Sequence, residues 1–247
     1  MATDLELLIR DKYDGDVAQV TDEDRERLAA GEPLAYVIGW IPFLGIQVHL
    51  DSKPLIPRPE TEWWTELLLM HLRERFGNEP FSFLDLCAGS GAIGLAVLRA
   101  FPEAAVTFAE LIPEHCELIE KNIRENDLLR KSTMIYHSDV FEGIPMDARF
   151  DCIATNPPYI PEGRALDTSV TRFEPAEALF AGSDGLSIIR RIAAGARERL
   201  SPGGEIWMEC DITNIEAASV LLLGSAAYRT DIRSDLYGRP RLVVAYF

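Results

Sequence analysis

Four consecutive residues, Asn156–Tyr159 (NPPY), combine an amide side chain, two prolines and an aromatic ring directly after an apolar run. Prolines lack N–H groups and hold φ near about −65°, so the carbonyl of Pro157 is free to point outward. That carbonyl and the side-chain oxygen of Asn156 would accept the two hydrogens of a planar NH₂ group, on which the ring of Tyr159 could stack. The tetrapeptide, Pro158 included, therefore predicts a catalytic site for an amide or amino nitrogen.

An amide nitrogen is a poor nucleophile because its lone pair is delocalised into the carbonyl group. Hydrogen bonds that pull on its two hydrogens would concentrate electron density on nitrogen during an in-line attack on a sulfonium methyl group, and alignment would supply much of the acceleration. Such a transfer requires neither a metal nor a covalent nucleophile, and the sequence predicts neither. Its four cysteines, at positions 87, 116, 152 and 210, form no CxxC or Cys/His cluster with zinc-ligand spacing.

A second group of residues lies at a strand-to-helix junction in DLCAGSGAIG (85–94), where Gly89, Gly91 and Gly94 match GxGxxG. Glycines at this turn let the backbone approach a ligand, and the start of the helix offers free N–H groups. Glu110 ends the next apolar run about 20 residues further on, where an acid can accept both ribose hydroxyls of an adenosine. The pair predicts a nucleoside-containing cofactor and fits NAD and S-adenosylmethionine equally. The NPPY segment decides in favour of the methyl donor.

From residue 81 onward the chain alternates strand-like and helical segments, which is typical of a parallel sheet covered on both faces. The apolar patterns predict seven strands, at 83–87, 105–110, 133–139, 151–156, 205–210, 229–233 and 241–247. Helical periodicity is expected around Ile93–Ala100 and Ile112–Ile123, and over 184–200 and 214–227. This order predicts a doubly wound, Rossmann-like α/β domain whose last two strands form a hairpin.

The preceding residues predict a short N-terminal helical and hairpin extension at 1–55, followed by a catalytic domain at 56–247. Thr21 is expected to cap a helix through DEDRERLAA that ends at Gly31. The stretch 33–45 is rich in aromatic and β-branched residues, and IQVHL (46–50) alternates like a strand. After a proline-dense connector, ETEWWTELLLMHLRERF should form a helix that stops before Gly77.

Composition restricts the partners and the compartment. Forty acidic against 24 basic residues give a net charge of −16, which argues against direct nucleic-acid binding because phosphate contacts need a basic face. The apolar stretches are shorter than the roughly 18 residues of a membrane span, and the N-terminus lacks the layout of a signal peptide. Dispersed cysteines fit a reducing compartment, so we predict a cytoplasmic protein, or an organelle-matrix protein if the chain is truncated.

Four separated segments also resemble one known family. GEPLAYVIG (31–39), IPRPETE (56–62), DLCAGSGAIGLA (85–96) and NPPYI (156–160), followed by RFEPAEAL (172–179), are similar to the HemK/PrmC family of release factor glutamine methyltransferases. NPPY alone is shared with adenine and guanine amino methyltransferases, whereas its combination with RPETE and FEPxxAL is much more specific. The resemblance implies a class I S-adenosylmethionine-dependent methyltransferase fold and a protein partner, a peptide chain release factor with a GGQ glutamine.

The resemblance also implies roles for individual residues. Cofactor contacts fall on Cys87, Ala88, Gly89, Ser90, Gly91, Glu110, Asp139, Val140 and Asn156, with Glu110 on the ribose and Asp139 and Val140 beside the adenine. Substrate contacts fall on Arg58, Thr61, Glu62, Asn156, Pro157 and Tyr159, and Glu174 and Pro175 are expected to order a lid after NPPY.

The chain also departs from the family pattern. Cys87 and Ala88 stand where Gly-Thr is more usual, Val140 stands where a large side chain is common, and only about 30 residues precede GEPLAYVIG. Methylation of a ribosomal-protein glutamine or of an exocyclic amino group in nucleic acid are the alternative activities. An NAD-dependent oxidoreductase would leave NPPY without a role, and the intact NPPY also weighs against a domain that binds without turnover.

Overall fold

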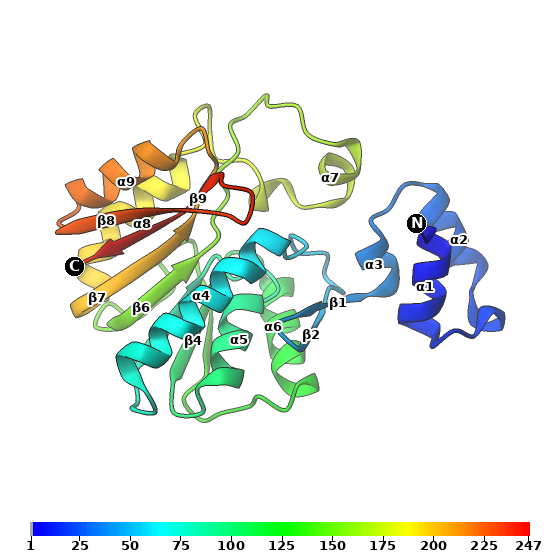
Figure 1. Cartoon of the computed structure of the whole chain (residues 1–247), viewed down its shortest axis with the longest axis horizontal. Coiled ribbons are helices and arrows are strands. Elements are labelled where there is room, and N and C mark those ends of the chain that lie inside the picture. The colour runs from blue at the N-terminus through cyan, green and yellow to red at the C-terminus, as the bar shows by residue number, and fades with distance from the viewer. Residues whose placement is uncertain (1) are drawn as a thin grey trace.

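The computed structural model describes residues 2–247, which form one large α/β body with a smaller group of helices at the N-terminus (Figure 1). The strands are β1 (Trp40–Phe43), β2 (Ile46–His49), β3 (Ser82–Leu86), β4 (Ala105–Glu110), β5 (Met134–His137), β6 (Phe150–Thr155), β7 (Leu200–Glu209), β8 (Arg229–Ser234) and β9 (Pro240–Tyr246). The α-helices are α1 (Asp4–Tyr13), α2 (Asp22–Ala29), α3 (Leu34–Ile38), α4 (Pro59–Phe76), α5 (Ala92–Ala100), α6 (Pro113–Glu125), α7 (Thr168–Phe173), α8 (Ser187–Arg199) and α9 (Ile215–Gly224). Short 3₁₀ turns cover Val17–Gln19 and Ala176–Ala178.

Within residues 2–247 the main sheet has seven strands in the order β5-β4-β3-β6-β7-β9-β8. Strands β3 to β7 run parallel, and β9 is antiparallel to both β7 and β8. Leu86 of β3 pairs with Thr155 of β6, so the carboxyl ends of these two neighbours meet at one edge. The strand order changes direction between them, which is where ligands bind in open α/β sheets. The predicted doubly wound fold is confirmed.

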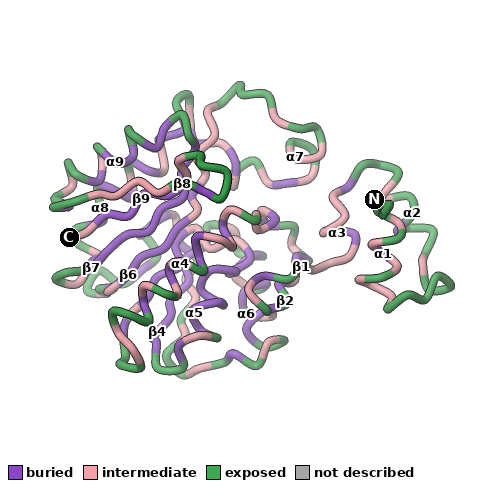
Figure 2. The backbone as a smooth tube through the Cα atoms, in the orientation of Figure 1, coloured by how far each residue is buried: buried purple, intermediate pink, exposed green. Residues whose placement is uncertain are grey.

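Two layers of helices cover the sheet. Buried residues of α4, α5 and α6 pack with Phe83, Val106 and Phe108 on one face, whereas α8 and α9 pack with Leu84 and Ile206 on the other. In Figure 2 the strands of the sheet are largely buried while the outer sides of these helices are exposed. Successive side chains of each strand point to opposite faces of the sheet, so every strand contributes to both apolar cores. The polar residues at the strand ends remain available to form a site.

Most predicted elements are found with small shifts in their bounds. Strand 105–110 is observed as predicted, and α4 ends at Phe76 because Gly77 follows it. The helix expected at 184–200 begins only at Ser187, because Gly185 has φ +72°, a left-handed conformation that glycine tolerates and a helix excludes. Strand β7 starts earlier than predicted, at Leu200, which pairs with Phe150 across a bulge.

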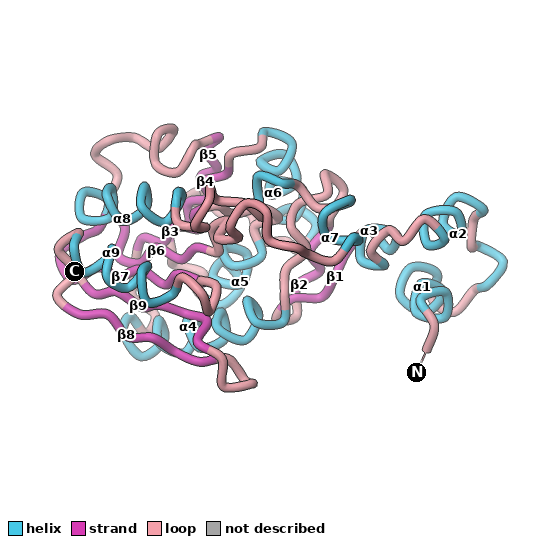
Figure 3. Tube along the Cα trace, turned by 90° about the horizontal axis from the view of Figure 1, so that it is seen from above, coloured by secondary structure: helices cyan, strands magenta, loops and turns pink. Residues whose placement is uncertain are grey.

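The N-terminal helices project to one side of the sheet (Figure 3), and the hairpin β1–β2 lies between the two. Thr21 forms a reciprocal capping box with Asp24, which confirms the predicted start of α2. Hairpin residues Phe43 and Val48 belong to the same apolar core as Trp64, so the hairpin packs on the large body. The domain boundary after residue 55 stays a prediction. No helix between residues 2 and 247 is long and apolar enough to cross a membrane.

Candidate active site

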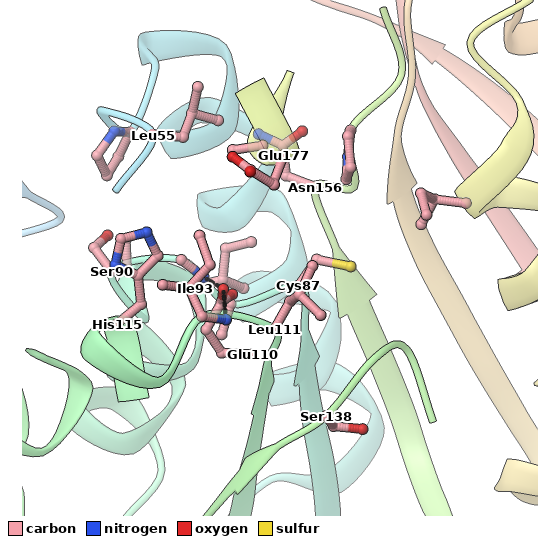
Figure 4. Close-up of a pocket in the computed structure, with 18 of the residues that line it drawn as sticks. Leu55, Cys87, Ser90, Ile93, Glu110, Leu111, His115, Ser138, Asn156 and Glu177 are labelled. Atoms are coloured by element: carbon pink, nitrogen blue, oxygen red, sulfur yellow. Dashed lines mark hydrogen bonds between the residues drawn. The ribbon is translucent and has the colours of Figure 1, made fainter. Parts of the chain in front are cut away.

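A cavity of about 900 Å³, measured to its open mouth, lies at the carboxyl ends of β3, β4 and β6. Figure 4 shows Leu55, Glu177 and Asn156 along one side of this cavity and Ser90, His115 and Leu111 along the opposite side. Most of its wall is apolar, and the polar groups are few and come from different elements.

The turn after β3 forms part of the cavity wall. Cys87, Gly89 and Gly91 have φ of +59°, +55° and +80°, so three residues of this turn occupy the left-handed region. Cysteine adopts that region at a cost that glycine would not carry. A Cβ atom on Gly94 would lie 2.2 Å from the ring of Phe108, so this glycine allows the helix to pack closely on β4.

Four of the five predicted loop residues, Cys87, Ala88, Gly89 and Ser90, line the cavity. Gly91 lies behind them, where it caps α5 and its N–H donates to the carbonyl of Ala88. Burial and the neighbouring Glu110 raise the pKa of the Cys87 thiol to about 12. The thiol therefore stays protonated near neutral pH and is not poised as a nucleophile.

Glu110 closes β4 with its carboxylate at the cavity wall. The N–H of Gly89 donates to Oε2 at 2.7 Å and the N–H of Ile112 donates to Oε1 at 3.0 Å. Burial raises the pKa of Glu110, although these backbone N–H groups act in the opposite direction. Each oxygen keeps a free lone pair, so the carboxylate can accept hydrogen bonds from two hydroxyl groups of a ligand.

The turn after β5 supplies the next part of the wall. Asp139 and Val140 line the cavity, and Val140 is buried with φ +54°. Their predicted contact with the adenine stays a prediction. Asp139 also accepts a hydrogen bond from Arg191 at 2.7 Å. Ser138 holds this turn, because its hydroxyl donates to the carbonyl of Val140 at 2.8 Å and accepts from the N–H of Gly143 at 2.9 Å.

The NPPY segment reaches the cavity through two of its four residues. Asn156 and Pro158 line the wall, whereas Pro157 is buried and Tyr159 packs against the core formed with α8 and α9. The Nδ2 of Asn156 donates to Oγ1 of Thr61 at 3.2 Å. Its Oδ1 is buried and has no hydrogen-bond partner among residues 2–247. An unsatisfied buried acceptor is costly, so this atom marks a position for a donor that comes from outside the chain.

The predicted substrate-binding residues Arg58, Thr61 and Glu62 separate into two groups. Thr61 lines the cavity, but Arg58 and Glu62 are held by the rest of the chain. Glu62 accepts from the N–H of Leu44 at 2.7 Å and so ties the β1–β2 hairpin to α4. Arg58 forms an ion pair with the buried Glu174 at 2.5 Å. Substrate contacts of Arg58 and Glu62 stay predictions.

The same ion pair joins the connector to the segment after NPPY. Glu174 also accepts from the N–H of Ile56 at 3.1 Å, and Pro175 precedes the 3₁₀ turn whose residues Glu177 and Ala178 line the cavity. The position of Glu174 is consistent with the predicted ordering of a lid.

Sequence reasoning missed a buried acidic residue next to the site. Glu209 ends β7 and is 1% exposed, and the hydroxyl of Tyr159 donates to its Oε1 at 3.0 Å. The hydroxyl of Tyr159, for which only a ring contact was expected, is therefore used within the chain. The signal for Glu209 was an acid at the end of an apolar strand, EIWMEC, which is the same signal that predicted Glu110.

Other residues of the wall were missed as well. Leu55 and Pro57 come from the proline-dense connector and His115 comes from α6, where a hydrogen bond between its Nδ1 and Ser52 Oγ at 2.8 Å fixes the ring. Nothing in the local sequence pattern distinguishes these residues from ordinary core or surface positions.

Comparison with known proteins places this geometry among methyltransferases. Residues 60–183 match the family model of the methyltransferase small domain. A release factor glutamine methyltransferase of Bordetella pertussis is 39% identical over 221 residues, which cover 89% of this chain and 80% of the relative. A release factor glutamine methyltransferase of Deinococcus radiodurans is 35% identical and covers 89% and 76%.

Solved structures agree on the fold. A 16S rRNA N2 G1207 methyltransferase of T. thermophilus, solved with AdoMet and guanosine, superposes with a TM-score of 0.56 at 24% identity and covers 84% of this chain and 49% of its own. A methyltransferase of Pyrococcus furiosus superposes with a TM-score of 0.59 at 15% identity and covers 92% and 98%. At these identities the likeness concerns the fold alone.

Proposed function

Because the chain belongs to the family of release factor glutamine methyltransferases, we propose that it transfers a methyl group from S-adenosylmethionine to the side-chain amide nitrogen of a protein glutamine. Its substrate is a peptide chain release factor, and the accepting residue is the glutamine of the GGQ motif. The cytoplasm, where release factors act, is the proposed location. The acceptor oxygen of Asn156, buried beside the cavity and left without a partner in residues 2–247, carries this proposal.

The residues around the cavity fit S-adenosylmethionine. Glu110 offers two carboxylate oxygens to the ribose hydroxyls, and the left-handed turn at 87–91 brings backbone close to the ligand. Asp139 and the buried Val140 line the part of the wall assigned to the adenine. When bound, S-adenosylmethionine would supply an electrophilic methyl carbon attached to a sulfonium sulfur, and this sulfur is already a good leaving group.

Asn156 acts on the acceptor nitrogen. With Nδ2 bound to Thr61, its Oδ1 is the atom that remains for an N–H of the substrate amide. The carbonyl of Pro157 is proposed to accept the second hydrogen. Two acceptors hold the planar NH₂ group in one orientation and draw density toward nitrogen, so the chain's contribution is alignment and polarisation rather than covalent catalysis. The protonated thiol of Cys87 is consistent with this assignment.

The first experiment tests the substrate. The protein is incubated with methyl-labelled S-adenosylmethionine and, separately, with a release factor, the same factor with alanine in place of the GGQ glutamine, ribosomal protein and RNA. Only the unchanged release factor is expected to become labelled. Equal labelling of the alanine-substituted factor would show that the glutamine is not the target, and labelled RNA would favour the nucleic-acid alternative.

The second experiment tests the cofactor without turnover. S-adenosylhomocysteine should raise the melting temperature, because a ligand that binds only the folded state stabilises it by about 2.7 kcal/mol at a hundredfold excess over its Kd. NAD should leave the melting temperature unchanged. A shift with NAD and none with S-adenosylhomocysteine would contradict the assignment of the cavity.

A further inference from the structure

Glu209 forms a buried hydrogen-bonded cluster directly beside the acceptor site. Thr155 of β6 pairs with Met208 of β7, so the residues that follow them, Asn156 and Glu209, leave neighbouring strands at the same edge. The Oε2 of Glu209 accepts from Oγ1 of Thr61 and from Nε1 of Trp64, both at 2.7 Å. The remaining oxygen accepts from the hydroxyl of Tyr159 at 3.0 Å. One carboxylate thus joins α4 to the NPPY loop.

This carboxylate is held by neutral donors. Among residues 2–247 no lysine, arginine or histidine lies within ion-pair distance of Glu209, although it is 1% exposed. Burial raises its pKa, while hydrogen bonds from Thr61 and Trp64 and the charge of Arg241 act in the opposite direction. Burying a carboxylate without an ion-pair partner is costly, and an apolar side chain would serve packing alone better. The cluster therefore requires an explanation beyond stability.

The direction of each hydrogen bond follows from the chemistry of the partners. The indole of Trp64 can only donate, so the Oε2 atom of Glu209 must accept. The hydroxyl of Thr61 has one hydrogen, and it is used on the same oxygen. Only lone pairs remain on Thr61 for Asn156, which must therefore present its NH₂ group to Thr61 at 3.2 Å. The Oδ1 of Asn156 is then forced to the other side, where it is the unpartnered acceptor described above.

We propose that Glu209 is a positioning residue that fixes the orientation of the Asn156 amide through the hydroxyl of Thr61. This inference rests on the proposed function, because it concerns the atom offered to the substrate amide. Without an acceptor at position 209, the hydroxyl of Thr61 is free to rotate and donate to Asn156. The amide of Asn156 then turns over and places its NH₂ group opposite the NH₂ group of the substrate. Two donors cannot bond to each other, so productive alignment is lost.

The test separates the acceptor from the charge. Glu209→Leu removes the acceptor, whereas Glu209→Gln can keep a carbonyl oxygen toward Thr61 and Trp64 and turn its NH₂ group toward the oxygen of Tyr159. Turnover of release factor is expected to fall on the order of 10- to 100-fold in Glu209→Leu, which is the scale of a misplaced reacting group. Glu209→Gln should stay within about threefold of the wild type. An equal loss in both variants would overturn the proposed role of hydrogen-bond direction.

Thr61→Val tests the link itself, because it removes the hydroxyl and keeps the volume. It should lower kcat as much as Glu209→Leu, and Thr61→Ser should restore most of it. The double variant should lose no more than either single variant, because both changes break the same chain of bonds. Losses that multiply would show that the two residues act independently and would overturn the proposal. Should Glu209→Leu fail to fold, Thr61→Val and Thr61→Ser decide the question.

A matched control lies on the same strand. Glu205 is also 1% exposed, but it is paired with His71 and Arg75 away from the cavity. Glu205→Gln should lower the melting temperature and leave kcat unchanged, and S-adenosylhomocysteine affinity should stay within about twofold in all these variants. If the wild type itself does not label the GGQ glutamine, the proposed function fails. If the wild type labels it and folded Thr61→Val turns over at the same rate, only this inference fails.

Discussion

Buried carboxylates serve different purposes in the two regions of this molecule. Glu110 and Glu209 at the sheet edge and Asp24 and Glu32 in the N-terminal extension are all less than 10% exposed. In the extension each carboxylate has a cation: Lys12 lies 2.8 Å from Asp24, and Arg27 lies 2.8 Å from Glu32. At the sheet edge the donors that hold the carboxylates are backbone N–H groups or neutral side chains. Ion pairs therefore hold Asp24 and Glu32 in the extension, whereas no ion pair within residues 2–247 holds Glu110 or Glu209.

The pKa values follow the same division. The hydrogen bonds of Arg27 lower the pKa of Glu32 to about 2. Burial acts to raise the pKa of Asp24, but donors led by Lys12 outweigh it and bring the value to about 2. Burial raises the pKa of Glu110 and Glu209. A carboxylate saturated by cations contributes to stability, whereas one held by a few neutral donors keeps lone pairs for a ligand or directs a neighbour.

The largest expected effect follows from removing the Oδ1 atom of Asn156, the acceptor that has no hydrogen-bond partner among residues 2–247. Asn156→Ala should reduce turnover by at least roughly 100-fold, a loss of about 2.7 kcal/mol of transition-state stabilisation. Affinity for S-adenosylhomocysteine should fall far less, because Glu110 and the turn at 87–91 remain. Steady-state kinetics with release factor and calorimetry with the ligand measure the two quantities. Full activity in Asn156→Ala would contradict the NPPY mechanism. Glu103→Gln, a substitution of an exposed residue, serves as the control.

A comparable effect on binding is expected at the ribose. Glu110→Ala removes a charged acceptor from two hydroxyl groups and should weaken S-adenosylhomocysteine binding by about 1.5–3 kcal/mol. The fold should persist because the carboxylate lies at a strand end. Isothermal titration calorimetry gives the affinity, and circular dichroism checks the fold. Unchanged affinity would mean that Glu110 supports the turn at Gly89 without touching the ligand.

The sequence predicted those residues of the site whose chemical type and position in the chain both point to the same role. Glu110 could be found because an acid that ends a buried strand at a fixed spacing from a glycine turn has few other uses. Asn156 could be found because the amide and the prolines are contiguous. Glu209 carries the first of these signals but has no motif around it, and its role depends on Thr61 and Trp64, which are about 145 residues away in the chain. Hydrogen bonds between residues so far apart in the chain leave no local pattern in the sequence.

The fold shows the same limit on a smaller scale. Alternating apolar runs placed β4 and β6 well, because buried parallel strands leave few other interpretations. The stretch 33–45 was rich in residues typical of strands, yet Leu34–Ile38 is a short helix and Trp40–Phe43 a strand. Gly39 separates them with φ +96°, and composition alone cannot locate that change of backbone.

The extension predicts a smaller effect, on stability rather than on activity. Glu32→Gln removes the charge that pairs with Arg27 and Lys53, and the free energy of unfolding should fall by about 1–2 kcal/mol. Affinity for S-adenosylhomocysteine should not change. Urea denaturation measures the first quantity and calorimetry the second. A weakened cofactor affinity would contradict the separation between the two regions.

The smallest effect concerns pH, and it has opposite signs in the two regions. The folded pKa of Glu32 lies at about 2, below its ordinary value of 4.5, so its contribution is complete above that ordinary value and is lost as pH falls toward 2. The stability of the wild type relative to Glu32→Gln should therefore shrink on acidification, by about 1 kcal/mol at about pH 4.

The folded pKa of Glu209 is raised, so its ionised form destabilises the folded state. The stability of the wild type relative to Glu209→Gln should accordingly rise as pH falls toward the ordinary glutamate value of 4.5. Urea denaturation of the three proteins between pH 7 and pH 4 yields both difference curves. Two curves of the same slope would show that burial and ion pairing do not divide the carboxylates of this chain as described.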